Sequence, residues 1–170
     1  YHPLIDRKAR RADVLASLQR VELVHLACHG RFDVEHPTRS GLLLDDGWLT
    51  IEDLKNLELS GLRLAIVAAC EGATSLPLPG SEAISLPVAL LLRGAHAVAA
   101  ALWRIPSDAT REFMGELHAA LLRQGPFAAM TMVQRASFSR DLASEAWCGY
   151  MLHVRGAPPR WWARLRLLLP

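Results

Sequence analysis

A histidine and a cysteine follow two short apolar runs of the chain. Residues 24–28 lead into His29 and Gly30, and residues 64–69 lead into Cys70. Each run is apolar and partly β-branched, which is typical of a buried strand in a parallel sheet. In open α/β sheets, functional groups gather just beyond the carboxyl ends of the strands. The two residues therefore indicate a cysteine nucleophile with a histidine acid–base partner, which is the chemistry of a peptidase.

Composition narrows the class of protein. The chain has 170 residues, of which 51% are hydrophobic, and this suits one globular domain with a single core. Its formal net charge of +2 is too small to indicate nucleic-acid binding. No strand is followed by the glycine-rich G-x-G-x-x-G loop of dinucleotide-binding folds, which argues against a nucleotide-dependent enzyme. We expect no direct contact with nucleic acid and no cofactor.

The cysteines and the apolar segments indicate a compartment. Three cysteines, an odd number without framework spacing, favour a reducing cytoplasm over an oxidising one. The basic residues 7–11 are not followed by the apolar stretch of a signal peptide. The longest apolar stretch, residues 86–92, is interrupted by Pro87 and is far shorter than the roughly 20 residues that cross a bilayer. We therefore expect a cytoplasmic protein without a transmembrane segment.

Apolar periodicity and turn residues predict alternating strands and helices. A hairpin is predicted over residues 41–49, with Asp45, Asp46 and Gly47 at its turn. The other expected strands cover residues 23–27, 62–69, 97–102 and 147–154. The expected helices are one within residues 1–20, a short one at 51–57 after Thr50 and Asp53, one from Ser81 to 92, one to 122 capped by Ser107 or Asp108, and one at 127–138. Loops are expected at 31–40 and 74–80. The alternation predicts an α/β fold with a mostly parallel, helix-covered sheet.

Four segments, in this order, resemble the CHAT domain, a branch of the caspase–separase clan of cysteine peptidases that is often found beside tetratricopeptide repeats. They are residues 24–30, 49–54, 68–71, and 93–98 continued through 101–103 to 108–110; residues 147–150 are a weaker echo. The resemblance covers about residues 12–156. It implies a caspase-like three-layer sandwich over residues 1–156, with helices on both faces of the sheet. Few residues precede the histidine strand, so the chain could be the C-terminal part of a longer protein or domain.

The resemblance also assigns roles to residues. It implies Cys70 as the nucleophile and His29 as the base, which then passes its proton to the leaving group. The backbone N–H groups of Gly30 and Cys70 would form the oxyanion hole. It further implies a protein or peptide substrate and a regulatory repeat domain or partner protein. Two features depart from the family pattern. The segment after Cys70 is longer and contains prolines, and Pro106 and Ser107 stand where acidic residues are usual.

Three carboxylates are candidates for substrate binding. Glu71 directly follows the nucleophile, and Glu82 and Asp108 lie further along the chain. Each could face a basic side chain of a substrate. The simpler interpretation is that each is a solvated surface carboxylate, and Asp108 is explained equally by a helix cap.

The remaining histidines and cysteines have plainer interpretations. A zinc site of His25, Cys28 and His29 is disfavoured, because strand alternation places Cys28 on the opposite face from the two histidines. His25 then becomes a hydrogen-bonded sheet histidine and Cys28 a core residue, while His96 and His118 take surface or packing positions. Cys148 is interpreted as structural, and no metal is expected. Buried free cysteine is common, so the alternative for Cys70 itself is a small core residue.

Two functions of different classes remain. The first is a cysteine endopeptidase regulated by a companion domain or partner, and the second is a catalytically silent interaction or effector module that keeps the fold. Residues 157–170 form a basic, aromatic C-terminal tail. This tail could lie on a membrane surface or dock on another part of the protein, and docking is favoured because the run is short.

Overall fold

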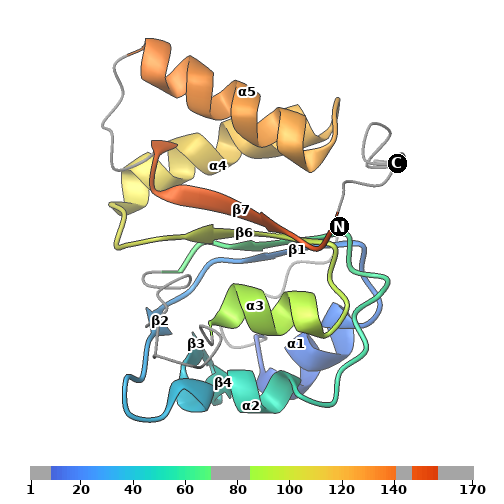
Figure 1. Ribbon diagram of the computed structural model, residues 1–170. Helices are drawn as coiled ribbons and strands as arrows, with labels where there is room; N and C mark the ends of the chain where they lie inside the picture. Colours follow the sequence, from blue (N-terminus) through green and yellow to red (C-terminus); the bar gives the residue numbers. More distant parts are fainter. Residues whose placement is uncertain (1–8, 70–84, 141–146, 157–170) are drawn as a thin grey trace.

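The main sheet has the strand order β1-β5-β6-β7 (Figure 1). Strands β1 (Leu23–Leu26), β5 (Leu64–Val67) and β6 (Ala97–Ala101) run parallel, and β7 (Tyr150–Val154) pairs antiparallel with β6. The structure is a computed structural model, and it describes residues 9–69, 85–140 and 147–156. Three of the four strands thus confirm the predicted parallel sheet. The fourth adds an antiparallel edge.

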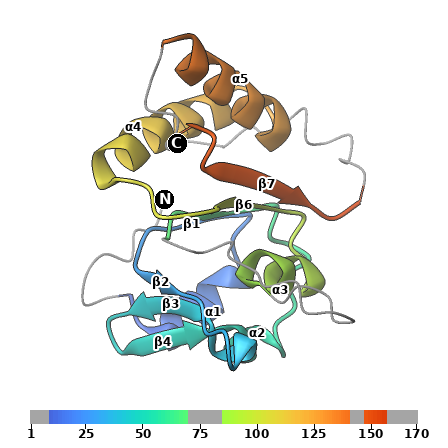
Figure 2. The same cartoon turned by 60° about the vertical axis from the view of Figure 1, so that its left-hand side comes forward.

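Helices lie on both faces of this sheet (Figures 1 and 2). Helices α4 (Ser107–Leu121) and α5 (Pro126–Ser139) cover one face, and α1 (Arg11–Leu18), α2 (Ile51–Leu54) and α3 (Leu86–Leu92) lie on the other side. The alternation of side chains along the strands divides the core in two. On β5, Ala65 and Val67 join the core on the α3 side, whereas Leu64 and Ile66 join the core below α4. The mixed α/β class is therefore confirmed.

Helix α4 shows why its segment folds as a helix on the sheet. Its buried side chains recur at the three- and four-residue spacing of one helix face, and the large ones are Phe113, Met114, Leu117 and Leu121. Burial of each such side chain contributes about 2 kcal/mol of hydrophobic free energy. The facing strand β6 consists of alanines and one valine, all buried, and its small side chains let the helices approach the sheet closely.

A small antiparallel sheet stands beside the main one on the α3 side (Figure 2). It contains β2 (Gly30–Arg31), β3 (Gly41–Leu44) and β4 (Gly47–Thr50), with a short 3₁₀ helix at Pro37–Arg39 before β3. The predicted hairpin is confirmed, because Leu44 pairs with Gly47 across the turn. The predicted loop over residues 31–40 has to be corrected at its start, where Arg31 belongs to β2.

The structure confirms the predicted start of α2 and corrects that of α3. At α2, the Thr50 hydroxyl accepts from the Asp53 N–H and the Asp53 carboxylate accepts from the Thr50 N–H, so the capping box is confirmed, although the helix ends at Leu54. Helix α3 begins at Leu86 with Ser85 as its N-cap, so the prediction of Ser81 in that role is wrong. The reason is Pro87, which fits only within the first turn of a helix.

The start of α4 is a second correction. Pro106 occupies the N-cap position without a side-chain hydrogen bond, and Ser107 and Asp108 are already helical. The fixed φ of a proline and the extended backbone it adopts at this position replace the expected side-chain cap. Asp108 instead places a negative charge in the first turn, where the helix dipole favours one.

Candidate active site

The ends of β1 and β5 bring the two candidate catalytic segments to one edge of the sheet. The strands are parallel neighbours in register, with Leu26 opposite Val67. The Ala68 N–H donates to the Leu26 carbonyl at 2.9 Å, which continues the pairing one residue beyond β5. His29 follows Leu26 by three positions, and Cys70 follows Val67 by the same number. The two segments therefore leave the sheet at the same edge.

His29 is an exposed residue in the segment that connects the main sheet to the hairpin sheet. Its carbonyl accepts a hydrogen bond from the Leu43 N–H at 2.8 Å. This bond fixes the backbone of His29 against β3 while the imidazole stays accessible to solvent. An acid–base group that protonates a leaving amine needs such access to the reacting atoms.

Gly30 carries an amide that the hairpin sheet does not use. Antiparallel neighbours alternate between hydrogen-bonded and non-hydrogen-bonded pairs. Because Leu43 donates to His29, the next pair, Gly30 with Leu42, is of the non-hydrogen-bonded kind. The Gly30 N–H thus points away from β3, and no group of the described residues accepts it. A free backbone donor one residue after His29 is what an oxyanion hole requires.

Cys70, Glu71 and Glu82 lie outside the described residues, as do the predicted loop at 74–80 and the C-terminal tail. The segment before Cys70 is described as far as Ala69, which is buried with 2% of its surface exposed. Asp108, the third candidate carboxylate, lies exposed in the first turn of α4, after β6 has left the same edge of the sheet.

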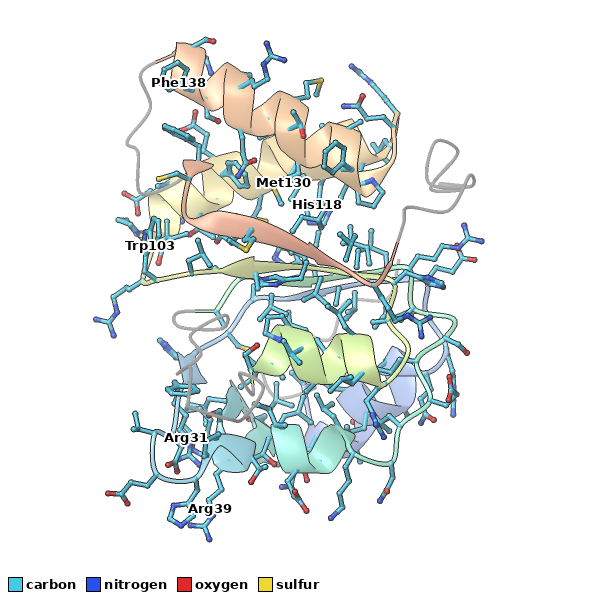
Figure 3. The ribbon with its side chains drawn as sticks, viewed as in Figure 1. Arg31, Arg39, Trp103, His118, Met130 and Phe138 are labelled. Atoms are coloured by element: carbon cyan, nitrogen blue, oxygen red, sulfur yellow. The ribbon has the colours of Figure 1, made fainter. Side chains whose placement is uncertain are left out.

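The residues around the end of β6 complete this edge. Trp103 is 40% exposed, and Figure 3 shows it at the end of β6 that leads into α4. The Leu102 N–H donates to the Gly149 carbonyl at 2.8 Å, so the segment that enters β7 lies alongside. Gln134 of α5 holds that segment by donating to the carbonyls of Trp147 and Tyr150, each at 2.9 Å. The described end of the sheet thus exposes one aromatic side chain, that of Trp103.

Of the cysteines in the described ranges, Cys28 has an environment that opposes a nucleophilic role. Cys28 is half-buried and packs against the core on the α3 side, which confirms its interpretation as a core residue. Burial raises the pKa of its thiol to about 11, and a thiol is a nucleophile only when it is ionised. Cys148, the other cysteine in the described part of the chain, is also half-buried.

One contact was missed by sequence reasoning. His25 of β1 and His118 of α4 share a hydrogen bond, with Nδ1 and Nε2 2.9 Å apart. His118 had been given a surface or packing position, and its partner is 93 residues away in sequence, so no local pattern could have revealed the pair. Within the described ranges, no three histidine, cysteine or acidic side chains gather as metal ligands. In the same ranges, no helix is long and apolar enough to cross a membrane.

The fold and this edge define an α/β protein with functional candidates at the carboxyl ends of parallel strands. The model of the CHAT domain family matches residues 1–168. The chain therefore belongs to the CHAT domain family, a caspase-like family of peptidases. A search of curated proteins found no match.

Proposed function

We propose that this chain is a cysteine endopeptidase that hydrolyses peptide bonds with Cys70 as nucleophile and His29 as general acid and base. The observation that carries the proposal is the in-register pairing of β1 with β5, from which both residues follow at the same offset. Membership of a caspase-like peptidase family and the unused Gly30 amide support it. The Cys28 thiol, with its raised pKa, is a poor competitor for the role.

The reaction proceeds in two stages. The Cys70 sulfur attacks the peptide carbonyl carbon, and the developing oxyanion accepts hydrogen bonds from the N–H groups of Gly30 and Cys70. Collapse of this intermediate breaks the C–N bond, and protonated His29 gives its proton to the leaving amine. Water then attacks the thioester and passes a proton back to His29. Release of the acid product restores the thiolate and the imidazolium.

Substrate selection is proposed to involve carboxylates. Glu71, Glu82 and Asp108 are the candidates to face a basic side chain, and the charged pairing would favour lysine- or arginine-containing peptides. A companion domain or partner protein is proposed to regulate the activity. Replacement of Asp108 by asparagine should lower kcat/KM for an arginine peptide about tenfold while leaving a matched glutamine peptide within twofold.

Covalent labelling tests the proposed nucleophile. A peptide carrying a thiol-reactive warhead should label the native chain and the Cys28→Ala and Cys148→Ala variants, but not Cys70→Ala. His29→Ala should fold and lose peptide hydrolysis. Equal labelling of the three cysteine variants would reject the peptidase and favour the alternative, a catalytically silent interaction module.

A further inference from the structure

One polar contact crosses from the edge strand β1 to the helix layer above it. Nδ1 of His25 and Nε2 of His118 lie 2.9 Å apart, and the ring centroids are 4.9 Å apart. Figure 3 shows His118 in the layer between α4 and the sheet. Among the described residues, no other hydrogen bond joins β1 directly to α4 or α5. In the described part of the chain, the His25–His118 hydrogen bond is therefore the polar contact that holds β1 against α4 on this face of the sheet.

The pair can hold at most one extra proton. At this distance one nitrogen must carry the hydrogen and the other must accept it. One added proton leaves that arrangement intact, since an imidazolium still donates to a neutral imidazole. A second proton places two N–H groups against each other and breaks the bond. Burial and the neighbouring His118 lower the pKa of His25 to about 4, and burial lowers the pKa of His118 as well.

The surroundings of the pair reinforce this behaviour. Nε2 of His25 is buried and has no partner among the described residues, so a proton there would be unsatisfied. The residue opposite His25 on β5 is the apolar Ile66. The acidic residues nearest to the pair in sequence have other partners: Glu22, just before β1, binds Arg63, and Glu116 of α4 binds Arg140. None of these carboxylates stabilises a doubly protonated pair.

The position of β1 gives the contact a consequence for the candidate site. Strand β1 is an edge strand, held in the sheet on one side by β5. Its chain continues from Leu26 to His29, whose carbonyl is held by Leu43 of β3. The segment that carries His29 is thus held at two points. His29 itself is bound to Leu43 of the hairpin, and His25, four residues earlier, is bound to His118.

We propose that His118 is a positioning residue, which through His25 fixes β1 and the segment carrying His29 against α4 and releases them when both imidazoles are protonated. The structural part of this inference stands alone. Its effect on catalysis rests on the proposed peptidase function.

Hydrogen exchange of the native chain and two His118 variants tests the structural part. Glutamine at position 118 keeps a donor and an acceptor, and leucine keeps neither. In His118→Leu at pH 7.5, amides of residues 23–27 should exchange about tenfold faster than in the native chain, after correction for intrinsic rates, because one net hydrogen bond is lost. In His118→Gln they should stay within threefold. Unchanged exchange in the leucine variant overturns the inference.

The pH dependence separates positioning from simple packing. Below about pH 4, residues 23–27 of the native chain should lose protection, whereas those of His118→Gln should retain it. His153→Gln is the matched control, since His153 is a half-buried histidine on β7 opposite Val98, on the other face of the sheet. This control should leave the exchange of β1 unchanged. Acid loss of protection that is equal in the native chain and His118→Gln overturns the inference.

Activity and spectroscopy complete the test. With a peptide substrate, His118→Leu should lower kcat about five- to tenfold with little change in KM, and His118→Gln should restore it. If the native chain hydrolyses no peptide but shows the expected exchange pattern, the peptidase proposal fails and the structural role of the His25–His118 pair is supported. Should His118→Leu not fold, histidine ¹⁵N shifts of the native chain decide the question: coupled titration of His25 and His118 supports the pair, and independent titration overturns it.

Discussion

Acid should destabilise the fold through His25 to an extent that can be worked from its burial. The pKa of His25 is lowered from 6.5 to about 4 in the folded chain, so the unfolded chain binds more protons between these values. Stability therefore falls as the pH drops below 6.5 and levels off near pH 4. Between pH 7.5 and pH 5.0, one such histidine removes about 2 kcal/mol from the free energy of unfolding.

Urea unfolding of the native chain and of His25→Gln at the two pH values isolates this contribution. Carboxylates titrate alike in both proteins, so their effect cancels in the comparison. The drop in unfolding free energy between pH 7.5 and pH 5.0 should be about 2 kcal/mol larger for the native chain. His36→Gln, at an exposed position, should show the native drop. Equal drops in the native chain and His25→Gln would refute the reasoning.

Three further predictions follow from packing, capping and burial. Gly94 has a φ of +117°, and a Cβ there would lie 2.8 Å from the Ser60 nitrogen, so Gly94→Ala should cost about 2–4 kcal/mol in urea unfolding. Gly61→Ala, where a Cβ meets nothing, should change stability by less than about 1 kcal/mol, and similar costs for the two would contradict this. Thr50→Ala should lose about 1 kcal/mol with its capping box, whereas Thr38→Ala, at an exposed position, should not. Cys28 should react with iodoacetamide about 100-fold more slowly than the same cysteine in the unfolded chain, as mass spectrometry can follow; comparable rates would contradict its burial.

Much of the fold could be predicted because its signals are local. The apolar runs that become β5 and β6 are short and continuous, and the hairpin is indicated by Asp45, Asp46 and Gly47. The capping box of α2 needs only Thr50 and Asp53, three positions apart. Such features depend on neighbouring residues, so a single sequence contains them.

The rest depends on contacts between distant segments. The start of α3 at Leu86 is an exception, because the neighbouring Pro87 sets it and Ser81 was predicted only because it also fits the pattern of an N-cap. Strand β2 is too short to show a period, and pairing with β3 defines it. The contact of His25 with His118 needs α4 to be laid over β1, which no local pattern predicts. At the candidate site, the residue types suggested the role of His29, whereas the role of Gly30 was implied by the resemblance to the CHAT domain. That the Gly30 N–H points away from β3 follows only from the register of β2 with β3.

The distance between the His29 ring and the Cys70 sulfur is the measurement that tests the central claim most directly. A crystal structure of the chain without ligand should place the nearest ring nitrogen within about 4–7 Å of Sγ, a looser separation than a hydrogen bond because sites without substrate relax. The same crystals soaked with a peptide warhead should show Cys70 bonded to it and the Gly30 N–H directed at its oxygen. A separation well beyond 7 Å that the warhead does not close would contradict the dyad and leave an interaction module.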